Sequence, residues 1–262
     1  MDNNPEQELK RLLALVGQQG ASDLHLVVGR HPTVRIDGKL HPITQEKILT
    51  PPDTKALSDV LLTEDKKQEL LSVGHTDFSY NYDDKVRFRT NVFLQKGYVS
   101  VTMRFVMDKL RNHDELGVPN SLYDFSQYSQ GLVLVTGPVG HGKSTTLAAI
   151  IDYINKNCEK HIVTIEDPIE FVYAQDRCII NQREIGRDAK NFPDALRAIF
   201  REDVNVVLLG ELRDLETIST AMTAAETGHL IFATLHTNDC AQTIDRVIDV
   251  FPAHKQNQIR AQ

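Results

Sequence analysis

A glycine-rich segment in the middle of the chain has the residue types and spacing of a phosphate-binding loop. Gly137 is followed by four residues and then by Gly142, Lys143 and Ser144. The glycines let backbone amides approach phosphates, the lysine neutralises β- and γ-phosphate charge, and the serine hydroxyl binds Mg²⁺. The alternative is a glycine-rich turn with no ligand. The residues predicted to bind a nucleotide are Gly137, Pro138, Val139, Gly140, His141, Gly142, Lys143, Ser144 and Thr145.

Acidic residues follow two other apolar runs of the sequence. Glu166 and Asp167 come after the run 161–165, and Glu211 comes after the run 204–209 and a glycine. Because ligands of open parallel sheets lie beyond the carboxyl ends of the strands, we expect these acids at the edge that carries the loop. There they could orient a water molecule for hydrolysis and hold a metal ion. Each acid alone fits a helix cap or a turn, so the catalytic interpretation depends on the loop.

Two histidines flank the last apolar run. His236 follows the run 230–235 and is predicted at the same edge as the loop, whereas His229 precedes the run. Seven residues of strand span more than about 20 Å, so the two side chains are not expected to share a metal ion. The spacing therefore argues against a zinc site.

The elements that must position these residues alternate between short apolar runs and helix-length segments. The runs are rich in β-branched residues and do not alternate with polar ones, which is typical of a parallel sheet covered on both faces. Apolar residues recur at helical spacing from Leu147 to Ile154, which places the loop between a strand and a helix N-terminus. The runs predicted as strands are 132–136, 161–165, 204–209 and 230–235.

Residues 22–106 have a different pattern, in which strands are separated by tight turns. Asp37-Gly38 and Lys96-Gly97 are residue pairs typical of such turns, and two helical segments flank or interrupt the strands. The change of pattern indicates two domains. The predicted parts are an α+β domain over residues 1–106, a polar linker over 107–120 and a second domain over 121–262.

Composition excludes some classes of protein and indicates a reducing compartment. A net charge of −7 gives no general attraction to nucleic acid, so we expect no nucleic-acid partner. The three cysteines, Cys158, Cys178 and Cys240, are odd in number and far apart, which favours the cytoplasm over a disulfide framework. No apolar run approaches the length of a membrane-spanning helix, so we expect no segment that crosses a membrane.

Seven segments, spread along almost the whole chain, carry recognisable motifs. They are GASDLHL at 20–26, GPVGHGKSTTLAA at 137–149, HIVTIEDPIEF at 161–171, NQREIG at 181–186, LLGELRDLETI at 208–218, AAETGHLIFATLHT at 224–237 and IDRVIDVFP at 244–252. These segments resemble the signature boxes of the PilT family of pilus retraction ATPases, within the secretion ATPase superfamily. The resemblance implies an α/β fold: a RecA-like P-loop NTPase domain with a mostly parallel sheet, preceded by a smaller PAS-like α+β domain.

The resemblance also implies a function and site roles. It implies a motor that hydrolyses ATP with Mg²⁺ and drives pilus retraction and twitching motility. The resemblance further implies a homohexameric ring at the cytoplasmic face of the inner membrane. Its partners would be an inner-membrane platform protein and the pilin fibre. By resemblance, Glu166 is the general base and Glu211 holds Mg²⁺ through water, together with Ser144. His229 and His236 form a box that relays nucleotide state to the neighbouring module and subunit.

The same resemblance implies a nucleotide-sensing role for two arginines of the N-terminal sheet. Arg87, Arg89 and Arg104 alternate with apolar residues and are predicted on the polar faces of their strands. That pattern alone fits a solvated face. Secretion ATPases present two arginines fifteen positions apart to the γ-phosphate, and Arg89 and Arg104 have this spacing. Arg87 is the alternative.

The chain departs from the family pattern in the loop and at its end. Val139 and His141 stand where the family usually has Thr and Ser, although both positions contribute mainly backbone amides. The chain stops at Gln262, whereas family members continue into a helical subdomain with the motif that marks retraction motors, so we expect a truncated sequence. The open alternatives are a PilU-like accessory motor, a pilus assembly or type II secretion ATPase, a nucleic-acid translocase, and a nucleotide-dependent regulator without hydrolysis.

Overall fold

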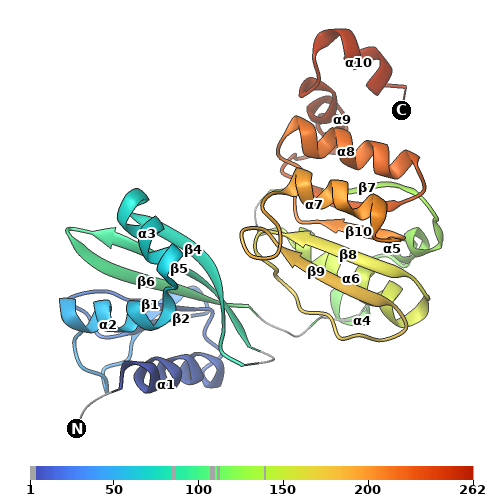
Figure 1. Ribbon diagram of the computed structural model, residues 1–262. Helices are drawn as coiled ribbons and strands as arrows, with labels where there is room; N and C mark the ends of the chain where they lie inside the picture. The colour runs from blue at the N-terminus through green and yellow to red at the C-terminus, as the bar shows by residue number, and fades with distance from the viewer. Residues whose placement is uncertain (1–3, 84–85, 107–109, 111–112, 139, 262) are drawn as a thin grey trace. The chain divides into compact units, whose positions relative to one another are not determined.

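The structure, a computed structural model, describes residues 4–83, 86–106, 110, 113–138 and 140–261. The chain divides into two compact units, Met1–Asp108 and Lys109–Gln262, each of which is described by itself (Figure 1). Part of the predicted linker 107–120 lies outside the described residues, and the rest contains the short helix α4 (His113–Leu116). Among the described residues, no helix is both long enough and apolar enough to cross a membrane.

The first unit combines an antiparallel sheet with helices. Its elements are α1 (Pro5–Gln18), β1 (Asp23–Leu26), β2 (Thr33–Ile36), β3 (Lys39–Pro42), α2 (Pro51–Leu61), α3 (Glu64–Val73), β4 (His75–Asn81), β5 (Arg87–Gln95) and β6 (Tyr98–Val106). The strands lie in the order β3-β2-β1-β6-β5-β4, and each neighbouring pair is antiparallel. Leu9 and Leu12 of α1 and Leu57 of α2 share one core with Phe88 and Met103 of the sheet.

Two hairpins of this sheet close through the predicted turn residues. Asp37 and Gly38 connect β2 to β3, and Lys96 and Gly97 connect β5 to β6. All four residues have positive φ. Positive φ at both central positions is the geometry of a type I′ turn, whose twist matches that of the flanking strands. Short-range sequence chemistry therefore sets the register of both hairpins.

The second unit is a parallel sheet with helices on both faces. Its elements are α4, α5 (Ser121–Asp124), η1 (Phe125–Gln127), β7 (Gly131–Thr136), α6 (Lys143–Asn157), β8 (His161–Glu166), β9 (Ile179–Glu184), α7 (Phe192–Ala198), η2 (Ile199–Arg201), β10 (Val206–Leu209), α8 (Leu215–Glu226), β11 (Leu230–Leu235), α9 (Cys240–Asp249) and α10 (Ala253–Ile259). The strands lie in the order β7-β11-β10-β8-β9, and each neighbouring pair is parallel. The predicted α/β class with a parallel sheet is confirmed.

Both faces of this sheet are buried, as the apolar runs predict. Along β10, Val207 packs in one core with residues of α7 and α8, whereas its neighbour Leu208 packs in a second core with residues of α6. The four predicted strands correspond to β7, β8, β10 and β11. Because successive side chains of a strand point to opposite faces, a strand buried on both sides is apolar at every position.

The sequence pattern does not predict β9, because polar residues interrupt it. Its sequence is IINQRE, and within it only Ile180 and Glu184 are buried. In the described sheet β9 is an edge strand that pairs with β8 alone. An edge position tolerates polar and charged residues that a central strand would exclude. The strand nevertheless carries Glu184 to the carboxyl edge of the sheet, beside Glu166.

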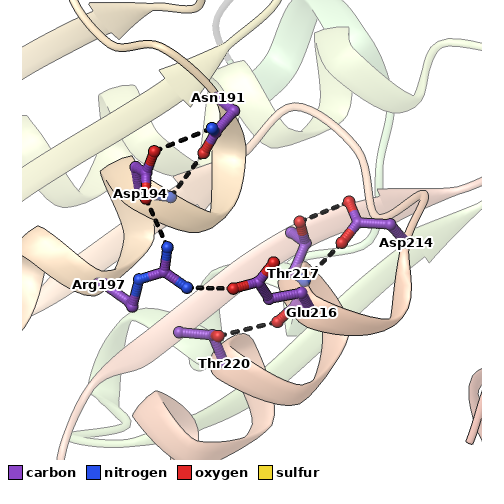
Figure 2. Close-up of polar contacts among 7 residues, drawn as sticks. All are labelled: Asn191, Asp194, Arg197, Asp214, Glu216, Thr217 and Thr220. Carbon is purple, nitrogen blue, oxygen red and sulfur yellow. Dashed lines mark hydrogen bonds and ion pairs between the residues drawn. The ribbon is translucent and has the colours of Figure 1, made fainter.

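Helices α7 and α8 begin with side-chain caps and are joined by an arginine (Figure 2). At α8, Asp214 accepts hydrogen bonds from the amide of Thr217 at 2.8 Å and from its hydroxyl at 2.7 Å. At α7, Asn191 accepts from the amide of Asp194 at 2.8 Å. Arg197 of α7 pairs with Asp194 and with Glu216 in the first turn of α8. The caps fix where both helices start, and hence how they cover the sheet.

We expect Asp214→Ala to lower the free energy of unfolding by about 1–2 kcal/mol, because the cap is lost and the fully buried hydroxyl of Thr217 loses its acceptor. Urea unfolding of the purified chain measures the change. The control is Glu216→Ala, two residues after Asp214, which removes the exposed ion pair with Arg197. Exposed pairs contribute little, so the unfolding midpoint of the control should stay close to that of the wild type. Equal losses in both variants would contradict the capping role.

Candidate functional site

The phosphate loop lies between β7 and α6, as predicted. Gly140 and Gly142 each have a φ of 80°, a left-handed conformation that glycine adopts without strain. Gly142 is the N-cap residue of α6, so the loop leads directly into the helix N-terminus, where free amides favour anions. Val139 lies outside the described residues. His141 is exposed in the loop, and Ser144 is half-buried in the first turn of the helix together with Thr145.

Lys143 lies against the inside of this loop. Its Nζ atom donates hydrogen bonds to the carbonyl oxygens of Gly137 at 2.8 Å and Pro138 at 2.9 Å. The residue is only 8% exposed. A buried ammonium group is costly unless it is hydrogen-bonded or paired with an anion. The loop thus holds a positive charge at the place where the pattern predicts phosphate oxygens.

His236 connects this lysine to an acid two strands away. Its Nδ1 atom lies 3.4 Å from Nζ of Lys143, and its Nε2 atom lies 3.4 Å from Oε2 of Glu211. A lysine ammonium can only donate, so Nδ1 accepts and Nε2 carries the proton that points to Glu211. The strand order β7-β11-β10 brings the three side chains together. Glu211 also pairs with Arg213, a partner that the sequence interpretation missed.

Glu166 ends β8 and is buried, with an exposed fraction of 7%. Its Oε1 atom accepts from the hydroxyl of Thr164 at 2.7 Å, and its Oε2 atom accepts from the amide of Glu170 at 3.3 Å. Burial raises the pKa of this carboxyl group from 4.5 to about 7. A carboxyl group whose pKa lies near neutral pH suits a general base.

Glu170 is a second acid in the same segment, and the sequence interpretation did not assign it a role. It is exposed, unlike Glu166, and its amide donates to Glu166. The segment EDPIE contains three acids, and the sequence offers no sign of which is buried. Glu184, at the end of β9, is also buried and also lacked a role. Its only signal in the sequence is its place within the motif NQREIG.

Glu166 should make the stability of the chain depend on pH. Its pKa is raised on folding, so its contribution favours the folded state below pH 4.5 and is lost as pH rises through about 7. Glu166→Gln removes this titration. The free energy of unfolding of the wild type, relative to this variant, is expected to fall by on the order of 3 kcal/mol between pH 4 and pH 8. Urea unfolding at both pH values measures the difference, and the control Glu170→Gln, which keeps Glu166, should keep the fall in the free energy of unfolding.

Three further predicted site residues are His229 of the second unit and two arginines of the first unit. His229 directly precedes β11, at the opposite end of the strand from His236, and its ring contacts Phe200 edge-to-face at 5.4 Å between centroids. The second unit therefore does not bring His229 to the loop. Arg89 and Arg104 belong to the first unit, where they are register partners on β5 and β6. The Nε atom of Arg104 donates to the buried carboxyl group of Asp23 at 2.9 Å.

A loop between the first strand of a parallel sheet and its helix, with acids at neighbouring strand ends, defines a P-loop nucleotide-binding domain. The profile of the family described as "Type II/IV secretion system protein" matches residues 2–261. The type IV pilus retraction ATPase PilT of Pseudomonas aeruginosa is 46% identical over 97% of this chain and 74% of its own length. The type IV pilus ATPase PilU of the same organism is 36% identical over 96% of this chain and 66% of its own length.

A crystal structure of the pilus retraction motor PilT with bound ADP has a TM-score of 0.91 to this chain. The two sequences are 45% identical, and the matched region covers 96% of this chain and 73% of the PilT chain in the crystal structure. The chain belongs to the Type II/IV secretion system protein family and, within it, to the PilT family. The resemblance that the motifs indicate is thus confirmed.

Proposed function

We propose that this chain is an ATP-hydrolysing motor of the type IV pilus machinery, which couples ATP hydrolysis to pilus retraction and so to twitching motility. The observation that carries the hydrolytic part is the phosphate loop whose lysine is connected through His236 to Glu211. The pilus part is supported by the likeness to the retraction ATPase PilT, which exceeds the likeness to PilU.

The loop residues bind the phosphates of ATP. The backbone amides of the loop glycines Gly137, Gly140 and Gly142 donate to the phosphate oxygens, and the ammonium group of Lys143 exchanges its carbonyl partners for the β- and γ-phosphates. The hydroxyl of Ser144 and the carboxyl group of Glu211 are oxygen ligands of the kind that Mg²⁺ takes, so the residues fit that ion. When bound, Mg²⁺ would neutralise charge on the transferring phosphoryl group.

A carboxyl group of the segment after β8 activates the attacking water. Glu166 is our first candidate, because its pKa of about 7 leaves it able to take a proton near neutral pH. Glu170 is the second candidate, because it is exposed and so in reach of solvent. In either case the buried carboxyl group of Glu166 holds the amide of Glu170.

The remaining site residues sense nucleotide state. Arg89 and Arg104 offer guanidinium groups that pair bidentately with phosphate oxygens, and Asp23 holds Arg104 by its Nε atom. His236, placed between Lys143 and Glu211, relays the state of the loop. His229 acts at a distance from the phosphates, which fits a relay between modules or subunits.

The motor works as a homohexameric ring at the cytoplasmic face of the inner membrane. There it acts on an inner-membrane platform protein and, through it, on the pilin fibre. We expect no nucleic-acid partner, because a net charge of −7 gives the chain no general attraction to a phosphate backbone.

Phosphate release from Mg·ATP, measured over a range of protein concentrations, tests the enzymatic part. Turnover that rises faster than linearly with protein concentration supports a ring whose sites are completed by assembly. ATP binding without phosphate release would favour a regulator, and stimulation by DNA that disappears at high salt would favour a translocase.

Surface pili and spreading by twitching, compared between wild-type and variant cells, test the proposed role in pilus retraction. Cells whose motor carries Lys143→Ala should still display pili but fail to spread by twitching. Loss of surface pili would instead assign the chain to pilus assembly. Normal spreading would overturn the retraction role.

A further inference from the structure

We propose that Glu184 is a positioning residue for the acidic segment 167–170, an inference that rests on the proposed hydrolytic function. Glu184 ends β9 and is the register partner of Glu166 on β8. The residue is only 4% exposed although it carries a carboxyl group. Burying such a group is costly unless it is hydrogen-bonded. The side chain therefore needs a partner, and it finds one outside its own strand.

That partner is the backbone of the acidic segment. The Oε2 atom of Glu184 accepts a hydrogen bond from the amide of Ile169 at 3.3 Å. The next amide, that of Glu170, donates to Oε2 of Glu166, also at 3.3 Å. Two buried carboxyl groups from adjacent strands thus hold two successive amides. The position of the segment relative to Glu166 depends on both of them.

Glu184 is itself held in place by the turn that follows β9. Its amide donates to Oδ2 of Asp188 at 2.9 Å, and its carbonyl oxygen accepts from the amide of Asp188 at 2.8 Å. The amide of Ile185 donates to the carbonyl oxygen of Glu166 at 2.9 Å. Because its backbone is fixed, the reach of the Glu184 side chain determines where Ile169 lies.

Two conservative variants separate the length of the Glu184 side chain from its chemical group, and we expect opposite effects on hydrolysis. Glu184→Gln keeps the length of the side chain and an oxygen that can accept from Ile169, so it should hydrolyse ATP at close to the wild-type rate. Glu184→Asp keeps the carboxyl group but is one methylene shorter, so it should lower kcat about ten-fold and leave KM for ATP within about two-fold. Arg187→Ala, at an exposed residue of the same turn, is the matched control and should leave both constants unchanged.

Amide hydrogen exchange adds a readout that does not need activity. Protection of the Ile169 amide, followed in peptides that cover 167–171, should be lost in Glu184→Asp and kept in Glu184→Gln. Loss of kcat or of protection in Glu184→Gln overturns the proposal, even if Glu184→Asp fails to fold. Unchanged protection in a folded Glu184→Asp overturns it as well. If the wild type releases no phosphate, the proposed function fails, whereas exchange still decides whether Glu184 holds the segment.

Discussion

Replacing Lys143 with alanine is expected to lower phosphate release from Mg·ATP by at least about 100-fold. The ammonium group of Lys143 donates hydrogen bonds to two carbonyl oxygens of the loop. In the proposed reaction the same positive charge stabilises the phosphoryl group as it is transferred. Its removal also takes away a partner of His236. A coupled phosphate assay on the purified variant measures the loss, and circular dichroism shows that the variant is folded.

The matched control for Lys143 is another lysine of the same helix. Lys156 lies in the last turn of α6 and forms an exposed i,i+4 pair with Asp152. Lys156→Ala should therefore release phosphate at the wild-type rate. A folded Lys143→Ala chain with more than about a tenth of wild-type turnover would contradict the role of the loop in hydrolysis.

Glu166→Gln is expected to lower kcat by about 100-fold or more while ATP binding is kept, because the variant retains the loop but loses the group that takes a proton from water. The amide side chain still has an oxygen that can accept from the Glu170 amide, so the segment should keep its shape. Single-turnover phosphate release and equilibrium binding of a fluorescent ATP analogue separate the chemical step from binding.

Glu170→Gln, run beside it, decides between the two carboxyl groups. If Glu166 is the base, Glu170→Gln should change kcat by less than about ten-fold. The reverse result, with collapse in Glu170→Gln and near-normal turnover in Glu166→Gln, would assign the base to the exposed acid and leave Glu166 a supporting role. Asp167→Asn, at a further exposed acid of the segment, controls for a general loss of negative charge.

Much of the second unit could be predicted because its signals are local. The loop pattern identifies the strand before it and the helix after it. Strands β8, β10 and β11 are apolar on both faces because both faces are covered, and the apolar strand β7 is half-buried. Acids predicted at strand ends lie where the parallel topology must put them. The turn pairs of the first unit are equally local, since positive φ at Asp37 and Gly38 follows from residue type.

The rest depends on neighbours that the sequence does not show. Strand β9 carries polar residues that its edge position tolerates, and an edge is defined only once the sheet is assembled. The burial of Glu166, and with it the raised pKa, comes from packing around the end of β8. The contacts of Glu184 with Ile169 and of His236 with Lys143 join residues far apart in the chain or in different elements. Periodicity carries no information about such contacts.

The strand order has a consequence for the order in which products leave. The loop follows β7 and the acidic segment follows β8, with β11 and β10 between them. Three strand spacings separate the two by about 14 Å. In the proposed motor, the bound nucleotide would connect the loop to the acidic segment across that distance. Cleavage of the γ-phosphate would break that connection, so release of phosphate and release of ADP from the loop would be two separate events.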